Sequence, residues 1–348
     1  MTSATTVVET FAERGDEAAR RQPLWDYVQA SGLRSLVVGA SKNPNAKITI
    51  LLVSPTGRPV LAIKVPTTEA AAGTVQREAR VLGKLRRLGL GLATTIPRVV
   101  DSVDFNSLTA LVMTAVDGTP MSTEYLRWRY TARRAAVAAH FNAAAGWLAD
   151  LQRGTAGETS PLEMDAGVAA RLSSRFCEDR QVAADLEALA AIHARLRRDV
   201  VPRTAVHGDF WLANVLLSRG RVSGVVDWED GDTAGEPVRD IVRFALMYAL
   251  FLDRRTRPGR NVPGHGGLRA GEWGAGIRYA IDGAGWFPEL FSGFLRDGLG
   301  RLGASPAGWR DAALAGLAEV AALTDDDVFA RRHLELFRAL VGREAGLA

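Results

Sequence analysis

Three polar residues in one short stretch have the chemistry of a phosphate-transfer site. Asp209 follows His207-Gly208, Asn214 comes five residues later, and Asp227 directly follows an apolar run. A carboxylate at the tip of a loop can orient a hydroxyl group and accept its proton. A carboxylate and an amide oxygen are both suitable ligands for Mg²⁺. The types and spacing therefore predict a base, Asp209, and two magnesium ligands, Asn214 and Asp227.

A lysine in an apolar strand supplies a second part of such a site. Lys64 lies in the sequence Leu-Ala-Ile-Lys-Val, and burying an ammonium group is costly unless it has a partner or faces a cleft. Glu78 comes fourteen residues later, early in the next predicted helix, and can pair with Lys64. We expect the pair to hold the ammonium group against the phosphates of a nucleotide.

The N-terminal part of the chain is rich in strand patterns. Residues 1–32 form a polar tail and a short helix that begins at Pro23. Residues 33–116 predict a mostly antiparallel sheet with one helix inserted after the third strand. The expected strands are 35–39, 48–53, 59–65, 99–104 and 108–116, and the expected helix is 76–88.

The composition changes after the helix breakers of Asp117–Pro120. Residues 131–200 are rich in Ala, Leu and Arg and begin with a long helix, 131–153, and a hairpin-like segment follows at 203–228. Residues 254–272 are rich in Gly, Pro and Arg, which predicts a mobile loop or an insertion. Further helices are expected at 237–253, 273–283, 287–302, 307–322 and 326–341. We therefore treat 117–348 as one helical region.

The length and composition of the chain exclude several classes of protein. The 348 residues suffice for two domains or two lobes. No apolar run has the length of a membrane span, and the N-terminus lacks the pattern of a secretory signal. The single cysteine, Cys177, excludes an internal disulfide framework. The net charge of +4 is not gathered into a basic face with interleaved aromatics. We expect a cytoplasmic protein that binds neither membrane nor nucleic acid.

The order of these motifs resembles the aminoglycoside phosphotransferase and choline-kinase-like family. The resemblance covers about residues 33–250. It is strongest in His207-Gly208-Asp209-x₄-Asn214, in Val226–Glu229 and in Gly235-Glu236-Pro237-x₂-Asp240. It implies an α+β, bilobal protein-kinase-like fold, in which a small antiparallel sheet forms the N-lobe and a larger, mostly helical region forms the C-lobe.

The resemblance also implies roles for individual residues. Asp209 is the catalytic residue, Asn214 and Asp227 hold Mg²⁺, and Lys64, paired with Glu78, contacts the phosphates of ATP. GTP is an alternative nucleotide. By the same resemblance, Asp240 and His207 brace the catalytic loop. The backbone of Thr114 to Val116 resembles the hinge that binds adenine, and Ser41 could contact a phosphate.

Several departures separate the chain from protein kinases. The loop Gly39–Asn45 contains one glycine, so it is not a glycine-rich phosphate loop. Gly208 stands where protein kinases have Arg, Asp227-Trp228-Glu229 replaces Asp-Phe-Gly, and no Ala-Pro-Glu follows. A protein-substrate groove is therefore disfavoured. A lipid kinase is also disfavoured, because no amphipathic membrane-binding helix is evident.

The sequence leaves the acceptor open. Carboxylates would suit a cationic acceptor, although those at 325–327 could simply cap the next helix. The arginines of 254–260 favour a neutral or anionic acceptor. Aromatic side chains could stack on a sugar or an ammonium group. The carboxylate candidates are Glu229, Asp230, Asp232, Glu236, Asp325, Asp326 and Asp327, and the aromatic candidates are Trp211, Trp228, Trp273, Trp286 and Phe287.

We predict an ATP-dependent phosphotransferase that transfers the γ-phosphate to a hydroxyl group of a small molecule. An aminoglycoside-like antibiotic, a sugar or an amino alcohol would be such an acceptor. The alternative is a non-catalytic nucleotide-binding protein that retains the kinase-like fold. The sequence does not indicate an oligomeric state.

Overall fold

The structure is a computed structural model that describes residues 22–40, 45–164 and 167–345. The chain divides into two compact units. Unit 1 contains the described residues up to Thr119 together with Asn214–Thr233, and unit 2 contains Pro120–Ala213 and the described residues from Ala234 onward. The segment 214–233, which we grouped by sequence with the helical region 117–348, thus belongs to unit 1.

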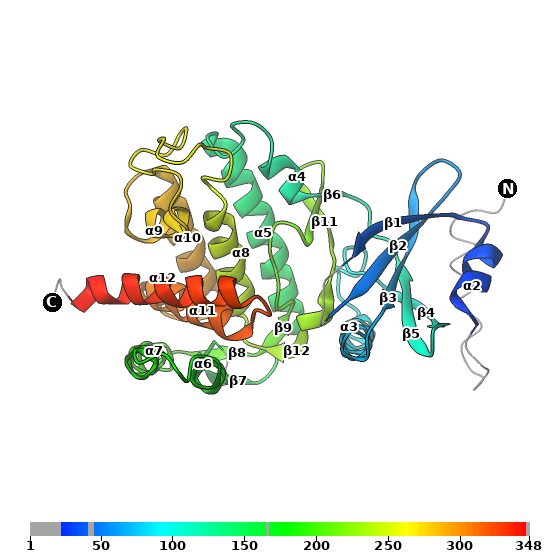
Figure 1. Cartoon of the computed structure of the whole chain (residues 1–348), viewed down its shortest axis with the longest axis horizontal. Helices are drawn as coiled ribbons and strands as arrows, with labels where there is room; N and C mark the ends of the chain where they lie inside the picture. Colours follow the sequence, from blue (N-terminus) through cyan, green and yellow to red (C-terminus); the bar gives the residue numbers. More distant parts are fainter. Residues whose placement is uncertain (1–21, 41–44, 165–166, 346–348) are drawn as a thin grey trace. The chain divides into compact units, whose positions relative to one another are not determined.

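Unit 1 is built on a five-stranded sheet of order β1-β2-β3-β5-β4 (Figure 1). Every adjacent pair of strands is antiparallel. Lys64 lies in the middle of this sheet, opposite Thr49 on one side and Leu111 on the other. The strands are β1 (Arg34–Ala40), β2 (Lys47–Val53), β3 (Pro59–Pro66), β4 (Val99–Phe105) and β5 (Leu108–Thr114).

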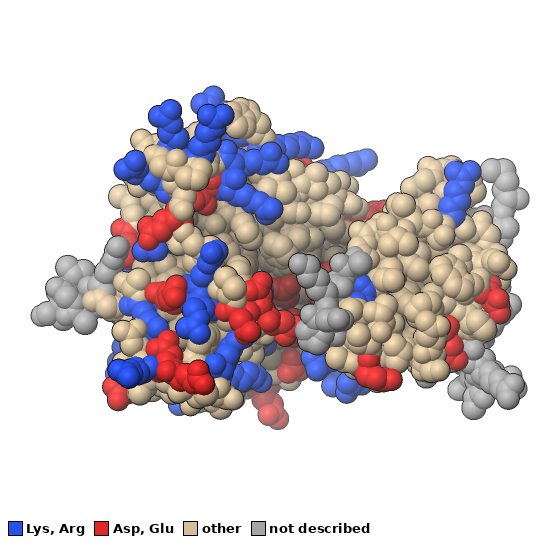
Figure 2. All heavy atoms as spheres, viewed as in Figure 1, with Lys and Arg blue, Asp and Glu red and all other residues tan. Residues whose placement is uncertain are grey.

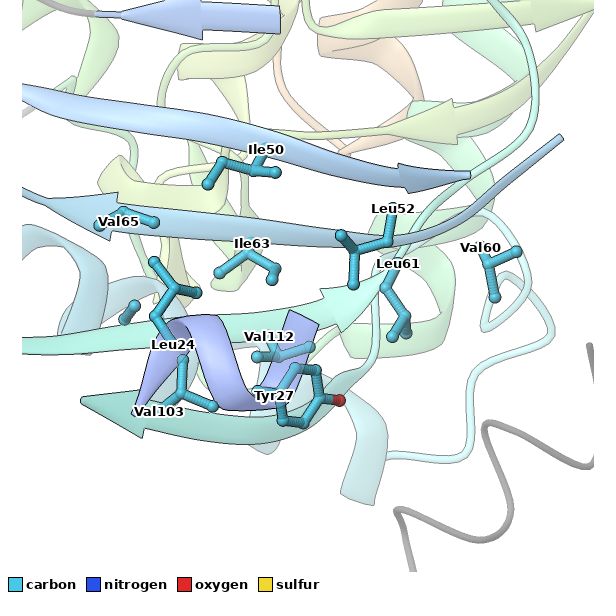
Figure 3. Packing of buried hydrophobic residues seen from close by; sticks show 11 residues of the cluster. Leu24, Tyr27, Ile50, Leu52, Val60, Leu61, Ile63, Val65, Val103 and Val112 are labelled. Carbon is cyan, nitrogen blue, oxygen red and sulfur yellow. The ribbon is translucent and has the colours of Figure 1, made fainter. Parts of the chain in front are cut away.

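The helix α2 (Leu24–Ser31) completes the hydrophobic core of this sheet. Leu24 and Tyr27 are three residues apart, so they share one face of the helix. Both are fully or nearly fully buried, and they pack with the apolar side chains that the strands present to them (Figure 3). The strand members of this cluster are Ile50, Leu52, Val60, Leu61, Ile63, Val65, Val103, Ala110 and Val112.

The helix α3 (Glu69–Arg87) contacts β3 and β5 and carries Glu78. It begins seven residues before the expected helix of 76–88. Thr68 explains the earlier start, because its side chain accepts a hydrogen bond from the N–H group of Ala71 and caps the helix. The buried face includes Val75, Glu78 and Val81. A carboxylate on an otherwise apolar face requires a partner in the core.

A short hairpin completes unit 1. It consists of β10 (Val215–Ser218) and β11 (Arg221–Val225), and the 3₁₀ helix η1 (Trp228–Asp230) follows it. The N–H group of Val225 donates a hydrogen bond to the carbonyl of Thr95, at 2.8 Å. The hairpin is therefore attached to the part of unit 1 that precedes β4, far away in the sequence.

Unit 2 is mostly helical, and aromatic side chains fill its core. Phe141 of α5 lies edge-on to Phe244 and Tyr248 of α8 and to Phe294 of α10. The helices are α4 (Met121–Tyr125), α5 (Arg134–Thr155), α6 (Val168–Arg175), α7 (Val182–Leu196), α8 (Val238–Leu250), α9 (Ala275–Asp282), α10 (Trp286–Arg301), η2 (Pro306–Gly308), α11 (Trp309–Leu323) and α12 (Asp327–Ala345). The short strands are β7 (Thr159–Pro161), β8 (Val200–Pro202) and β9 (Thr204–Val206), while β6 (Thr119–Pro120) and β12 (Asp232–Gly235) lie where the chain passes between the units.

The segment 254–272, for which the sequence predicts a mobile loop or an insertion, is hydrogen-bonded to other parts of unit 2. The Nε2 atom of His265 lies 2.9 Å from the carbonyl oxygen of Thr131, and Trp286 donates a hydrogen bond to the carbonyl of Gly264 at 2.8 Å. Gly264 has a φ of +80°, and a Cβ atom there would lie 2.7 Å from the backbone of Ala132. Composition alone did not reveal these contacts.

The predicted fold class, an antiparallel sheet in the N-terminal part and helices in the C-terminal part, is confirmed. Within 22–40, 45–164 and 167–345, no helix is both long enough and apolar enough to cross a membrane. Cys177 is exposed, just beyond the end of α6.

Candidate functional site

A buried ion-pair cluster in unit 1 is centred on Lys64. Its Nζ atom lies 2.6 Å from Oε2 of Glu78 and 2.6 Å from Oδ1 of Asp227. The side chains of Lys64 and Glu78 are only 5% and 0% exposed, whereas that of Asp227 is 44% exposed. Burial lowers the pKa of Lys64, but the two carboxylates outweigh this effect and raise the pKa overall. The ammonium group is therefore held in its charged form.

Glu78 also connects α3 to the segment that follows the hairpin. Its Oε1 atom accepts a hydrogen bond from the N–H group of Trp228 at 3.1 Å. The indole of Trp228 is fully buried and donates a hydrogen bond to the carbonyl of Val225 at 2.9 Å. One carboxylate thus orients Lys64 and fixes the backbone next to Asp227.

Asp227 and Asn214 lie at the same end of the hairpin. The N–H group of Val226 donates to the carbonyl of Asn214 at 3.0 Å, and the side chain of Asn214 is buried. Asp227 has a φ of 66°, in the left-handed region, where a residue with a Cβ atom is disfavoured by roughly 1–2 kcal/mol. The chain maintains this conformation while presenting a carboxylate beside Lys64.

These two residues fit a magnesium ion. They offer a carboxylate oxygen and an amide oxygen, and Mg²⁺ is commonly held by one or two protein oxygens with phosphate oxygens and water. Among the described residues, no three His, Cys, Asp or Glu side chains are grouped so that they could hold a metal by themselves. A magnesium ion at Asn214 and Asp227 would therefore take further ligands from a nucleotide.

Lys47 is a member of the cluster that the sequence did not reveal. It forms an ion pair with Glu229. Burial lowers the pKa of Lys47, and the nearby charge of Lys64 lowers it further. The signal is the strand register, because Lys47 opens β2 two residues before Thr49, which faces Lys64. Glu229, a sequence candidate for acceptor binding, is thus engaged within unit 1.

In unit 2, Asp209 is held by an arginine that the sequence analysis missed. Nε and Nη2 of Arg243 both donate hydrogen bonds to Oδ1 of Asp209, at 3.0 and 2.7 Å. Arg243 lies on α8, one turn after Asp240. Its position in the sequence carries no special pattern, so only the structure connects it with Asp209.

The loop that carries Asp209 is braced by Asp240. The N–H groups of His207 and Gly208 donate to the two carboxylate oxygens of Asp240, at 2.6 and 2.9 Å. Burial raises the pKa of Asp240, and these two bonds oppose that rise. His207 is fully buried, and its Nδ1 atom accepts a hydrogen bond from the N–H group of Asp209 at 3.2 Å. Both residues have the bracing contacts that the resemblance implies.

The predicted adenine hinge lies at the end of β5. The N–H group of Thr114 donates to the carbonyl of Arg98 at 2.8 Å, and that of Ala115 donates to the carbonyl of Val60 at 3.0 Å. β5 ends at Thr114, so Val116 lies beyond the strand rather than inside it. Thr114 and Val116 remain predictions as adenine contacts, and Ser41 lies outside the described residues.

Several sequence candidates for acceptor binding are buried or engaged in contacts within the fold. Asp326 caps α12 by accepting a hydrogen bond from Phe329 at 2.9 Å, and Asp327 pairs with Arg175 at 2.6 Å. Trp228 and Phe287 are fully buried. Glu236 is buried too, and burial raises its pKa to about 7.

Comparison with known proteins identifies the family. Residues 49–274 match the model of the phosphotransferase enzyme family, APH. This range spans well over half of the chain, and the chain belongs to that family. No curated protein sequence matches it.

Solved structures of similar fold cover most of the chain. One is a thermostable mutant of aminoglycoside phosphotransferase APH(4)-Ia in ternary complex with AMP-PNP and hygromycin B, at 17% identity and a TM-score of 0.54, covering 90% of this chain and 95% of that one. Another is the apoenzyme of macrolide 2'-phosphotransferase MphH from Brachybacterium faecium, at 15% identity and a TM-score of 0.51, covering 89% and 96%. At these identities the similarity establishes the fold.

Proposed function

We propose that this phosphotransferase transfers the γ-phosphate of ATP to a hydroxyl group of a small molecule. The observation that carries the proposal is the buried Lys64, which lies 2.6 Å from both Glu78 and Asp227. Burying the charged groups of Lys64 and Glu78 is costly, and a fixed ammonium group beside the partly exposed carboxylate of Asp227 suits the phosphates of a nucleotide.

In unit 1, Lys64 would bind the non-transferred phosphates, and Glu78 would keep its ammonium group in place. Asn214 and Asp227 would be the protein ligands of magnesium, which neutralises charge on the β- and γ-phosphates when it is bound. Lys47 adds a second positive charge close to this cluster. The nucleotide-binding residues proposed here thus all belong to one compact unit.

In unit 2, Asp209 would orient the acceptor hydroxyl and accept its proton. The hydroxyl oxygen then forms a bond to the γ-phosphorus while the bond to the β–γ bridging oxygen breaks, and ADP leaves. Arg243 would fix the orientation of the Asp209 carboxylate, and Asp240 would fix the loop that carries it. Asp209 and Asn214 are five residues apart in the chain, which supports roles for both in one transfer reaction.

The family and the names of the solved relatives support a proposal for the acceptor class. These relatives are named for phosphorylation of aminoglycosides and macrolides, which supports an antibiotic-like molecule, a sugar or an amino alcohol as acceptor. The proposal is tested by Mg·ATP turnover against a library of small hydroxyl compounds, with ADP release and a phosphorylated product as readouts. Full activity of Asp209→Asn would contradict the assigned role.

A non-catalytic nucleotide-binding protein would behave differently. It would be stabilised by ATP to the same extent with and without magnesium, and it would turn over no acceptor. The proposed enzyme should be stabilised more by Mg·ATP than by ATP alone, and Asp227→Asn should remove the difference. Thermal unfolding with both ligands therefore separates the two functions without knowledge of the acceptor.

A further inference from the structure

A cavity of about 670 Å³ in unit 2 is lined by the segments that follow and precede the loop 255–270 and by α12. Phe251, which lines it, contacts the ring of Trp211, two residues after Asp209. On another side, the lining residues Trp273 and Phe329 contact the ring of His333. The contact of Phe251 with Trp211 thus links the cavity to the loop that carries Asp209.

The lining combines aromatic rings with arginines. Arg254 lies over the ring of Phe251, at 5.5 Å, and Arg332 lies over the ring of Trp273, at 6.0 Å. These arginines occupy the places over the rings where a cationic ligand would gain its attraction. The remaining surface of the rings can still pack against a flat apolar group.

The charged side chains of the lining are three carboxylates and three arginines. Glu272 pairs with Arg278 at 2.7 Å, and Asp253 accepts a hydrogen bond from the N–H group of Gly271 at 3.1 Å. Glu335 is exposed and lies on α12, three residues after Arg332. The lining itself is therefore balanced in charge, and an excess of positive charge has to come from its surroundings.

The surroundings add positive charge. Residues 251–274 contain five arginines and two carboxylates. Figure 2 shows Lys and Arg side chains gathered over the part of unit 2 where this segment lies. Attachment of the segment through His265 and Gly264 keeps the charges in place. Such a field raises the local concentration of anions.

We propose that this cavity binds the acceptor and that the acceptor is a hydroxyl compound carrying an anionic group, such as a carboxylate or a phosphate, beside a flat apolar part. The inference rests on the proposed transfer to a hydroxyl group. Arg254 and Arg332 bind the anionic group, Trp273 and Phe329 pack against the apolar part, and a hydroxyl group of the same molecule is directed to Asp209.

Three probes of equal size and different charge test the inference. They are 4-nitrophenyl β-D-glucuronide, 4-nitrophenyl β-D-glucoside and 4-nitrophenyl 2-amino-2-deoxy-β-D-glucoside, which carry negative, zero and positive charge. Their affinities are measured by calorimetry on the full chain with Mg²⁺ and AMP-PNP. We expect the glucuronide to bind about tenfold more tightly than the amino sugar, with a smaller ratio at high salt.

Variants test whether the preference for the glucuronide over the amino sugar arises in the cavity. Arg254→Gln/Arg332→Gln should remove most of the preference, and Glu335→Gln should strengthen glucuronide binding. Arg180→Gln/Arg198→Gln removes two exposed arginines elsewhere in unit 2 and should leave the ratio unchanged. Equal or tighter binding of the amino sugar, binding of none of the probes, or the same ratio in both double variants would overturn the inference.

Turnover of the same probes separates the two proposals. Phosphorylation of the amino sugar in preference to the glucuronide would keep the proposed function and overturn the anionic acceptor. If the glucuronide binds with the expected ranking but no hydroxyl compound is ever phosphorylated, the proposed function fails and the acceptor role of the cavity fails with it. Preferred phosphorylation of the glucuronide supports both.

Discussion

The two units hold their chemical groups by different means. In unit 1, Lys64 is fixed by direct ion pairs with Glu78 and Asp227. In unit 2, Asp209 has an ion pair with Arg243, and Asp240 holds its loop through the backbone N–H groups of His207 and Gly208. The first arrangement depends on buried charge, and the second also depends on the path of the backbone.

This difference has consequences for substitutions. Removing a carboxylate in unit 1 leaves a buried ammonium group with fewer partners, so stability and nucleotide affinity should change together. Removing the brace in unit 2 leaves backbone groups without an acceptor and shifts the loop, so turnover should suffer more than nucleotide affinity. Three predictions test this contrast, and a fourth concerns the pH dependence of stability.

The largest effect is expected at Asp209. Asp209→Asn removes the proposed proton acceptor, and kcat should fall by roughly 10²- to 10⁴-fold while the Kd for Mg·ATP changes little. Arg243→Gln breaks the same ion pair but keeps the carboxylate, so it should retain much more activity. Steady-state kinetics and calorimetry measure the two quantities. Equal losses in the two variants would assign the effect to the ion pair.

Glu78→Gln should lower both the free energy of unfolding and the affinity for Mg·ATP. It weakens the partner set of a buried lysine and should lower the free energy of unfolding by about 3 kcal/mol, with at least a tenfold weaker affinity for Mg·ATP. Glu229→Gln removes the partner of Lys47, at the more exposed edge of the cluster, and should cost much less. Urea unfolding of both variants measures the two losses in the free energy of unfolding. Similar losses would show that the burial of Lys64 does not increase the cost of removing its partner.

Asp240→Asn tests the brace. An amide has one acceptor oxygen for two N–H groups, so the free energy of unfolding should fall by about 1–3 kcal/mol, and kcat should fall several-fold at unchanged Kd for nucleotide. Asp150→Asn, which alters an exposed carboxylate of α5, serves as the control. A change in nucleotide affinity without a change in kcat would contradict the contrast between the units.

The smallest effect is expected in the pH dependence of the free energy of unfolding. The pKa of Glu236 is raised from 4.5 to about 7 by burial. Between these pH values the folded protein holds a proton that the unfolded chain has released, so the free energy of unfolding falls as the pH rises through this window, by about 1–3 kcal/mol. Glu236→Gln should remove this component, and the exposed Glu187→Gln should not. An unchanged pH profile in Glu236→Gln would rule out Glu236 as its source.

Several features could be predicted from the sequence because they depend on local patterns. Strand alternation and apolar runs located β2, β3, β4 and most of the helices. A lysine inside an apolar strand and a glutamate on an apolar helix face both required a partner, and each is the partner of the other. The hinge at residues 114–116 and the bracing role of Asp240 were predicted from the family resemblance rather than from local patterns.

Other features depend on which segments meet in space. Lys47 joins the cluster only through the register of β2 against β3, and Arg243 meets Asp209 only because α8 packs beneath its loop. The contact of Gly264 with Ala132 joins residues more than a hundred positions apart, so the Gly, Pro and Arg content of the segment 254–272 could not reveal it. The helix α3 also begins earlier than its apolar pattern predicted, because Thr68 caps it.

The exposure of Cys177 makes the chain convenient for spectroscopy. It is the only cysteine in the sequence and belongs to unit 2, so a thiol-reactive dye attaches there without prior removal of other thiols. A second cysteine in place of Thr56, exposed in the turn between β2 and β3 of unit 1, would complete a donor–acceptor pair. Energy transfer between the two dyes would then report, in solution and molecule by molecule, whether nucleotide changes the separation of the units.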